Sequence, residues 1–460
     1  MITELEFKSL AAEGYNRIPL IAEAFADLET PLSLYLKLAT AGGNGKHSFL
    51  LESVVGGERF GRYSFIGLPA KTLLRASGFR TEVVTDGRVV ETHEGNPLDF
   101  IAQYQARFKV ALRPGMPRFC GGLAGYFGYD AVRYIEPKLA KTWKPGGIDT
   151  PDILLLQCEE LAVIDNLSGR LYLIVYADPR EPESFFRGKR RLSELADKLR
   201  YSVTAPAVKR GQSHGVEREF AKDDYIAAVL HSKELIAAGD MMQVQIGQRL
   251  KKRYTESPLS LYRALRSLNP SPYMYFYDMG DFQIVGASPE ILVRHEHTPD
   301  GDTVTIRPLA GTRPRGATTE QDKALEEELK SDPKERAEHL MLIDLARNDI
   351  GRIAKTGSVK VTEAFAVERY SHVMHIVSNV EGLLKDGMTN LDVLKATFPA
   401  GTLTGAPKIR AMEVIDELEP VKRGIYGGAC GYLSFAGDMD VAIAIRTGIV
   451  KDQTLYVQAA

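Results

Sequence analysis

Alternation of apolar and polar side chains in several short segments limits how this chain can fold. Residues 242–247 (MQVQIG) alternate strictly, so that the two faces of a strand would differ in polarity. Residues 151–165 and 171–178 also read as strands, whereas residues 184–200 have the periodicity of an amphipathic helix. Because several strands alternate instead of being apolar throughout, the sheets are expected to be antiparallel or mixed. The predicted fold class is α+β, or layered α/β.

The length of 460 residues exceeds what one compact core usually holds and predicts two or three domain-sized units. The clearest change in composition lies at residues 201–219, where large apolar residues give way to Gly, Pro, Ser and charged residues. We therefore predict a linker over 201–219 that separates an N-terminal half, 1–200, from a C-terminal half, 220–460.

The charge balance favours a small-molecule or protein partner. The 58 basic and 60 acidic residues give a net charge of -2 without charged blocks, so nucleic acid and anionic membranes are not expected partners. Cys120, Cys158 and Cys430 lack metal-ligand spacing and fit a reducing compartment. The N-terminus lacks the features of a signal peptide, and no segment approaches the ~18 apolar residues of a membrane span. A cytoplasmic location is predicted.

A helix with acidic residues in its first turns is predicted at 333–351. Asp332 is a suitable cap and Pro333 a suitable first residue. Glu335, Glu338 and His339 then share one face. The carboxylates could simply complement the helix dipole, or they could bind a hard cation such as Mg²⁺.

Two further segments carry candidate functional groups. Residues 369–382 read as a strand that places His375 on one face, either as a structural histidine or as an acid–base group. In residues 306–316, Pro308 and Pro314 bracket Gly311 and Thr312. This pattern predicts a stiff turn whose backbone amides point outward, although a plain surface turn explains it equally well.

Residues 398–420 resemble a phosphate loop in which the lysine is misplaced. Gly401 and Gly405 allow tight turns, and Thr402 and Thr404 place hydroxyls beside the free amides of a helix start. Such a site attracts an anion. Without the Walker lysine it suits a carboxylate better than a polyphosphate, with Arg446 of the alternating segment 441–450 as a possible counterion. A nucleotide-binding regulator is the competing interpretation.

Ten motifs in order along nearly the whole chain resemble those of the chorismate-utilising enzymes, most closely the large subunits of anthranilate synthase. They are LLESVVGGERFGRYSFIG, GGLAGYFGYD, NPSPYMYF, GASPE, PLAGTRPRG, DPKERAEHLMLIDLARND, SHVMHIVS, GTLTGAPKIRAM, YGGACGY and AIAIRT. The resemblance implies interleaved mixed or antiparallel sheets packed face to face, with helices outside. It also implies a lyase that converts chorismate and ammonia to anthranilate and pyruvate, the first committed step of tryptophan biosynthesis.

The resemblance assigns roles to individual residues of the C-terminal half. It makes Glu290 the general acid for the departing ring hydroxyl, His375 a participant in pyruvate elimination, and Glu338 a Mg²⁺ ligand. The remaining active-site residues that it implies are Gln243, Gly311, Thr312, Thr402, Tyr426 and Arg446. A second Mg²⁺ carboxylate is expected in a family C-terminal segment that lies beyond Ala460.

Two positions distinguish this chain from relatives with other products. Relatives that add water carry a lysine where Gln243 stands, and Gln cannot act as a base. The 4-amino-4-deoxychorismate synthases commonly carry a lysine where Ala310 stands. Ammonia attack leading to anthranilate is therefore favoured, with 4-amino-4-deoxychorismate synthase as the alternative.

The resemblance further implies feedback inhibition and a partner subunit. Residues matching a tryptophan pocket are Glu52, Ser53, Asn269, Pro270, Ser271, Pro272, Tyr273 and Met274. An apolar wall with a few polar groups suits an indole and an amino-acid head group. Because none of the three cysteines lies in a segment typical of a glutaminase, ammonia from glutamine would require a separate amidotransferase subunit in a hetero-oligomer.

Overall fold

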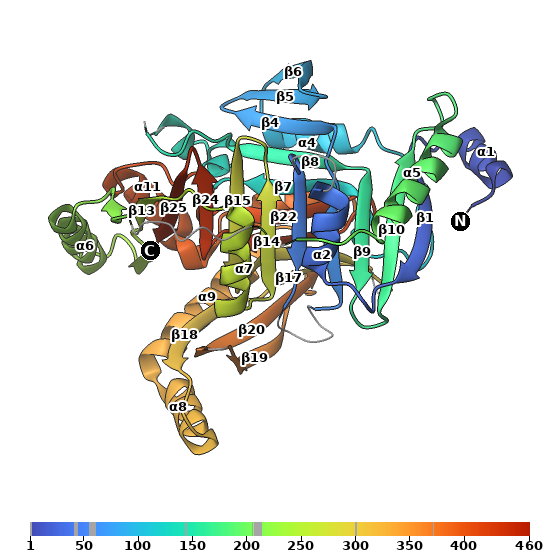
Figure 1. Ribbon diagram of the computed structural model, residues 1–460. Helices are drawn as coiled ribbons and strands as arrows, with labels where there is room; N and C mark the ends of the chain where they lie inside the picture. The colour runs from blue at the N-terminus through green and yellow to red at the C-terminus, as the bar shows by residue number, and fades with distance from the viewer. Residues whose placement is uncertain are drawn as a thin grey trace.

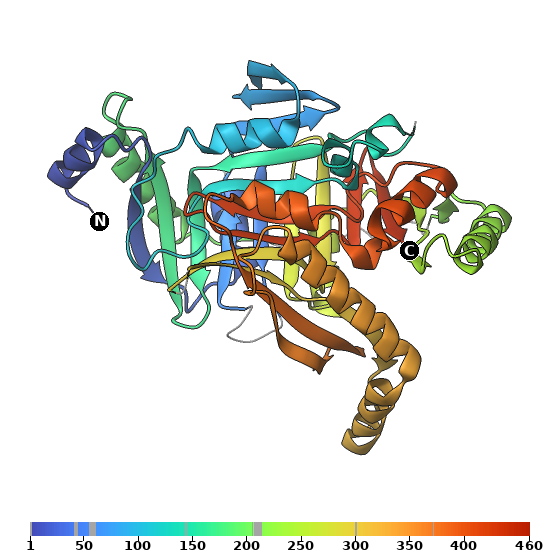
Figure 2. The ribbon, with the colours of Figure 1, turned by 180° about the vertical axis from the view of Figure 1, so that it is seen from behind.

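Two large β-sheets form the centre of the molecule, and helices cover their outer faces, as the two opposite views show (Figure 1 and Figure 2). The computed structural model describes residues 2–40, 45–54, 61–142, 144, 146–204, 206, 214–299, 301–370 and 372–460. Every pair of neighbouring strands in the described sheets is antiparallel. The predicted layered fold with antiparallel sheets is therefore confirmed.

The first sheet has eleven strands within the described ranges. In spatial order they are β1 (Ile18–Phe25), β10 (Arg170–Ala177), β9 (Glu160–Asp165), β3 (Tyr63–Gly67), β2 (Ser48–Glu52), β14 (Tyr273–Asp278), β15 (Phe282–Ser288), β24 (Thr447–Lys451), β25 (Thr454–Ala459), β13 (Gln248–Arg253) and β11 (Glu217–Arg218).

The second sheet has twelve strands in the part of the chain that the structure describes. In spatial order they are β18 (Leu309–Pro314), β20 (Val373–Leu383), β17 (Gly301–Ile306), β16 (Ile291–Thr298), β23 (Met439–Ile443), β22 (Ala429–Ser434), β7 (Gly122–Phe127), β8 (Ile153–Cys158), β4 (Thr72–Ser77), β5 (Arg80–Thr85) and β6 (Arg88–Glu94), with β19 (Lys360–Arg369) paired to β20. A separate ladder joins β12 (Gln243–Val244) to β21 (Gly405–Ala406).

Strand β8 shows how the sheets are layered. Leu154 and Leu156 belong to a core cluster shared by both sheets, which includes Phe49 and Tyr277 of the first sheet. Leu155, which points to the opposite face, belongs to a second cluster with helices on the outer side. A third cluster fills the space between the first sheet and its own helices. The order of layers is helix, sheet, sheet, helix.

The α-helices of the described residues are α1 (Glu4–Ala12), α2 (Pro31–Tyr35), α4 (Pro97–Gln105), α5 (Ser184–Lys198), α6 (Lys222–Ala237), α7 (Pro258–Leu268), α8 (Thr319–Ser331), α9 (Pro333–Gly351), α10 (Asn390–Thr397) and α11 (Lys408–Leu418). Six of them, α1, α2, α4, α8, α9 and α10, begin at a residue whose side chain caps them. The side chain of Asp332 accepts hydrogen bonds from the amides of Lys334 and Glu335, which confirms the predicted start of α9. None of the described helices is long and apolar enough to cross a membrane.

Both sheets take strands from both sides of the predicted linker. In the first sheet, β2 pairs with β14, and in the second, β7 pairs with β22. Within the proposed linker, residues 205 and 207–213 lie outside the described residues, and β11 pairs with β13 of the first sheet. The 1–200 and 220–460 segments therefore share their sheets and their central core.

Strand β7 explains the glycines concentrated at residues 121–128. A Cβ atom at Gly125 would overlap the carbonyl oxygen of Leu154 in the neighbouring strand, and one at Gly122 would overlap that of Leu433. The close approach of these backbones at the centre of the second sheet requires glycine at both positions.

We predict that Gly125→Ala destabilises the protein by roughly 3 kcal/mol, because the added methyl group has no space in the rigid sheet. Thermal melting followed by circular dichroism measures the effect. The control is Gly351→Ala at the end of α9, where an added Cβ meets no atom and helix propensity favours alanine by about 1 kcal/mol. Equal melting temperatures for the two variants would contradict this account of the strand.

Candidate active site

Two connections cross between the sheets at neighbouring positions: β15–β16 runs from the first sheet to the second, and β23–β24 runs from the second to the first. The amide of Ala287 donates to the carbonyl of Arg446 at 3.1 Å, and the amide of Ile443 donates to the carbonyl of Glu290 at 3.0 Å. These bonds hold the two connections together and bring Glu290 and Arg446 to the same place. Arg446 thus lies between two strands, with φ of 50°, and not within one alternating strand as predicted, because the chain changes sheets there.

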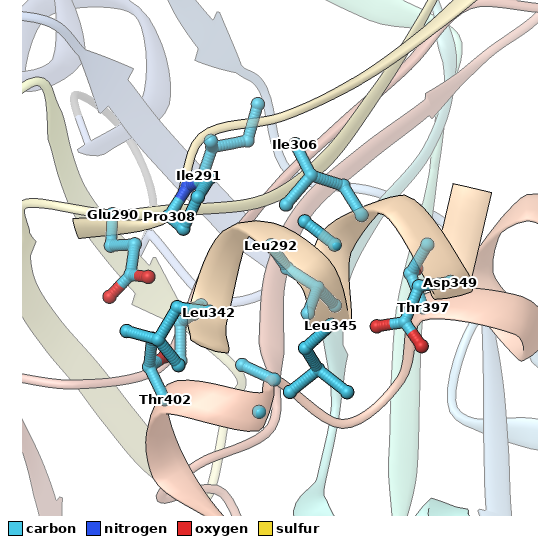
Figure 3. A pocket seen from close by; sticks show the side chains of 14 residues that line it. Glu290, Ile291, Leu292, Ile306, Pro308, Leu342, Leu345, Asp349, Thr397 and Thr402 are labelled. Carbon is cyan, nitrogen blue, oxygen red and sulfur yellow. The ribbon is translucent and has the colours of Figure 1, made fainter. Parts of the chain in front are cut away.

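Glu290 is a buried carboxyl group with 6% of its surface exposed. Burial raises its pKa to about 8, although the nearby Thr402 hydroxyl, the Leu309 amide and the Arg446 guanidinium each favour the charged form. Figure 3 shows Glu290 and Thr402 at one end of a cavity. At neutral pH Glu290 is therefore mostly protonated and can donate a proton.

His375 lies on β20 and is buried. Its Nδ1 lies 3.0 Å from the carbonyl of Gly311 and 3.0 Å from the hydroxyl of Thr312. Because a carbonyl can only accept, Nδ1 carries the proton, and the lone pair of a neutral ring is on Nε2. Burial lowers the pKa of His375, and Nε2 has no hydrogen-bond partner among the described residues. Such a nitrogen can accept a proton.

Gly311 and Thr312 belong to strand β18, so the predicted turn between Pro308 and Pro314 is wrong. The residues pair with β20, and the register shifts between Ala310 and Thr312. Gly311 has φ of 67°, which glycine adopts without strain. This bulge turns the Gly311 carbonyl toward His375 and so orients the imidazole.

Helix α9 places Glu338 beside Gln243 of β12. The Gln243 amide donates to Glu338 Oε1 at 3.3 Å, while its own Oε1 is buried without a partner among the described residues. The alternation of residues 242–247 favours an edge facing water, but this side chain faces α9. Strand β12 has two residues only. Its Gln243 pairs with Ala406, which closely follows Thr402 and Thr404 in the sequence.

The cavity between Glu290 and α9 is small. Its walls are Glu290, Ile291, Leu292, Ile306, Pro308, Leu342, Leu345, Ala346, Asp349, Thr397, Ala400, Gly401, Thr402 and Ile443. Its volume of about 30 Å³ is close to that of one water molecule. A ring-sized ligand therefore requires these walls to move apart. Thr402 lies in a short 3₁₀ helix, Gly401–Leu403, and its buried hydroxyl has no hydrogen-bond partner among the described residues.

The structure separates Tyr426 from this cavity. Tyr426 lines another small cavity with Arg249, Arg423 and Thr447, and the Arg423 guanidinium lies 5.6 Å from its ring centroid. Burial raises the pKa of Tyr426 to about 12, so its hydroxyl remains a donor at neutral pH. Thr447 directly follows Arg446, so this cavity borders the same connection.

The structure also identifies neighbours that the sequence analysis missed. The ring of Tyr370 packs edge-on against His375, with centroids 5.5 Å apart. Lys408 Nζ lies 2.7 Å from the buried carboxylate of Asp349. Since that lysine is the one misplaced within the GTLTGAPK loop, its pairing with Asp349 argues against a nucleotide-binding loop.

A second cavity, of about 70 Å³, lies between the two sheets. It includes five residues of the predicted tryptophan pocket, Glu52, Ser53, Pro272, Tyr273 and Met274. Arg294 and Asp440, which the sequence analysis did not identify, also line it. Asn269, Pro270 and Ser271 are outside its lining; the carbonyl of Ser271 instead accepts the amide of Val54 at 3.2 Å.

Comparisons with known proteins agree with the motifs. The family model of the chorismate binding enzymes matches residues 59–460. The chain is 58% identical to "Anthranilate synthase component 1" of Neisseria meningitidis, over 100% of this chain and 92% of that protein. It is 54% identical to the protein of that name from Pseudomonas aeruginosa, over 99% of this chain and 92% of the relative.

Solved structures extend the comparison to the fold. The crystal structure of anthranilate synthase component I from Streptococcus pneumoniae matches with a TM-score of 0.76 and 37% identity, over 95% of this chain and 93% of that one. The isochorismate synthase MenF from Escherichia coli matches with a TM-score of 0.71 at 16% identity, over 99% and 93% of the two chains, which shows a shared fold alone. The chain therefore belongs to the chorismate binding enzyme family.

Proposed function

We propose that this chain is the aminase component of an anthranilate synthase, which converts chorismate and ammonia to anthranilate, pyruvate and water. The proposal rests on one observation: a protonated Glu290, the cationic Arg446 and the neutral His375 lie together where the chain crosses between the two sheets. The identity of 58% over the whole chain to a relative of that name supports the same reaction.

The unsatisfied groups of the site suit an anionic substrate. Arg446 forms no ion pair with the described residues, although it is largely enclosed and burial lowers its pKa. The Thr402 hydroxyl also lacks a partner in that part of the chain. A buried cation without a counterion costs free energy, which a ligand carboxylate would offset. Chorismate carries two carboxylates, and Arg446 would bind one of them.

Glu338 has the properties of a ligand for Mg²⁺. No lysine or arginine among the described residues pairs with its half-buried carboxylate, whose hydrogen bond comes from the neutral Gln243 amide. Carboxylate oxygen is the donor that Mg²⁺ prefers. Glu338 would hold the ion together with further oxygen ligands. When bound, the ion supplies positive charge that draws electrons from the ring through its carboxylate.

The chain's own residues account for the proton transfers. As ammonia adds to the ring, Glu290 gives its proton to the departing hydroxyl, which leaves as water. The second step removes the hydrogen from the carbon that received nitrogen, and the enolpyruvyl C–O bond breaks to give pyruvate and the aromatic ring. His375 Nε2 can move a proton in this step, since Nδ1 is held by Gly311.

The identity of the nucleophile follows from Gln243. A neutral amide cannot remove a proton from water, whereas ammonia needs no such activation because it is itself a nucleophile. All three cysteines are buried, and burial raises the pKa of each thiol, to about 12 for Cys430. A thiol of this kind cannot act as a glutaminase nucleophile. Ammonia derived from glutamine would therefore come from a separate amidotransferase subunit, as the name component 1 of the relatives implies.

Product identification tests the proposal directly. The full chain incubated with chorismate, Mg²⁺ and ammonium salt should form 2-aminobenzoate and pyruvate in equal amounts, and chelation of Mg²⁺ should abolish turnover. Chromatography separates 2-aminobenzoate from 4-amino-4-deoxychorismate and isochorismate. Formation of 4-amino-4-deoxychorismate without anthranilate would instead assign the alternative reaction, and formation of isochorismate would show that Gln243 does not exclude water.

The pH dependence of kcat tests the role of Glu290. Because its pKa is about 8, the protonated acid is present below that pH and is lost as the pH rises through it. We expect kcat to fall above about pH 8 and Glu290→Gln to lower kcat by roughly 100-fold or more. The control Glu413→Gln changes a carboxylate of α11 that pairs with Arg410 and should leave the profile unchanged. A Glu290→Gln enzyme with normal kcat would refute this assignment.

Two residues connect the predicted tryptophan pocket with the surroundings of Glu290. Pro272 and Tyr273 line the cavity beside Glu52 and Ser53, and they also line a smaller cavity with Glu290 and Tyr370. A ligand that moved Pro272 and Tyr273 would therefore change the shape of both cavities. We propose the first cavity as the tryptophan site, in which the Glu52 carboxylate, already bonded by Tyr262 and Arg266, forms the polar end.

Ser53→Phe should abolish inhibition by tryptophan, since the larger ring would fill a cavity of about 70 Å³, while leaving uninhibited kcat within about twofold because Ser53 lies outside the catalytic cavity. Ser9→Phe on the exposed side of α1 is the matched control and should retain full inhibition. Inhibition curves over a range of tryptophan concentrations provide the measurement. Unchanged sensitivity of the Ser53 variant would place the inhibitor elsewhere.

A further inference from the structure

A group of potential metal ligands lies at the end of the β16–β17 hairpin that is remote from Glu290. It consists of His295 and His297 on β16 and Asp302 on β17. One ligand atom from each of the three side chains lies within 4.8 Å of the others, and no other such group occurs among the described residues. Seven residues of strand separate Glu290 from His297, a distance of roughly 20 Å.

The strand register brings these three side chains together. His297 pairs directly with Asp302 across the hairpin, and His295, two residues earlier, points to the same face of the sheet. One oxygen of Asp302 contacts His297 Nδ1, and the other lies 3.6 Å from His295 Nε2. The carboxylate therefore faces both imidazoles at once.

The burial of His295 without a hydrogen bond to the described residues is not explained by the ion pair between His297 and Asp302. Its exposed fraction is 3%, and neither ring nitrogen has a hydrogen-bond partner among the described residues. A neutral imidazole carries one donor and one acceptor, and leaving such groups buried and unpaired costs free energy. The His297–Asp302 contact gives those two residues a hydrogen bond, whereas His295, whose Nε2 lies 3.6 Å from Asp302, makes none within the described part of the chain.

The donor set and its surroundings suit a transition metal. Two imidazoles and a carboxylate are typical Zn²⁺ ligands, whereas Mg²⁺ takes oxygen ligands. The opposite edge of the His297 ring faces the backbone at Gly437, and the His297 amide donates to Asp438 at 3.2 Å. The backbone at Gly437 therefore limits the orientation of the His297 ring.

We propose that His295, His297 and Asp302 bind one divalent transition-metal ion of the zinc type per chain. The side chains of His297 and Asp302 are 49% and 38% exposed, so an ion could enter from solvent and keep a water as its fourth ligand. The ion would satisfy His295 and fasten the end of the hairpin. This site is separate in position and in ligand chemistry from the Mg²⁺ site proposed at Glu338.

Equilibrium dialysis of the full chain, without a polyhistidine tag, against Zn²⁺ tests the proposal. Mg²⁺ in excess is present throughout, so that oxygen-ligand sites are already filled. His297→Gln and Asp302→Asn change half-exposed side chains and are expected to fold, which circular dichroism checks. The matched control is His231→Gln on α6, where Nδ1 lies 3.5 Å from Glu234 in a histidine–carboxylate pair without a third ligand.

We expect one Zn²⁺ per chain in the wild type and in His231→Gln. Losing a direct ligand should weaken binding by more than the roughly 10- to 100-fold that loss of an outer partner causes. Co²⁺ in place of Zn²⁺ should give the visible absorption of a four-coordinate site in the wild type, and neither variant should show it. Absence of stoichiometric Zn²⁺ binding in the wild type, or equal binding in His297→Gln, would overturn the proposal.

Discussion

The active site depends on two places where the chain crosses from one packed sheet to the other. Where β15 continues into β16 and β23 into β24, the chain leaves one sheet and joins the other, and two backbone hydrogen bonds hold these connections side by side. Residues in such connections are enclosed by both sheets without taking part in a ladder. Glu290 is consequently buried and Arg446 half-buried, while the side chain of Arg446 forms no ion pair with the described residues.

The polar groups of this region differ from the paired arginines that are buried elsewhere in the protein. Arg133 pairs with Asp130 and Asp416, and Arg423 pairs with Glu419, so these charges are compensated within the fold. By contrast, Thr402 Oγ1, His375 Nε2 and Gln243 Oε1 lack partners among the described residues. Since buried polar groups are normally satisfied, their concentration on facing elements indicates where a polar ligand would bind.

The same two sheets also connect the proposed regulatory and catalytic sites. Strand β14 contributes Tyr273 and Met274 to the cavity between the sheets, and Tyr273 reaches the side of Glu290 as well. Because interiors are densely packed, a ligand that shifts Tyr273 must also shift the atoms around Glu290. Inhibition would thus need no large domain movement.

Several features followed from local sequence alone. Asp332 predicted the start of a helix and the glycines of β7 predicted a strand, because each residue acts directly on the backbone that it contacts. The motifs identified the family because their order along the chain needs no coordinates. The sequence analysis missed the course of residues 308–314, which form a bulged strand beside β20, and of residues 444–446, where the chain changes sheet. Both features depend on partners that are distant in sequence. Only the tertiary structure decided that Glu290 is a protonated acid and that His295 faces Asp302, because burial and cross-strand distance arise when separate segments pack together.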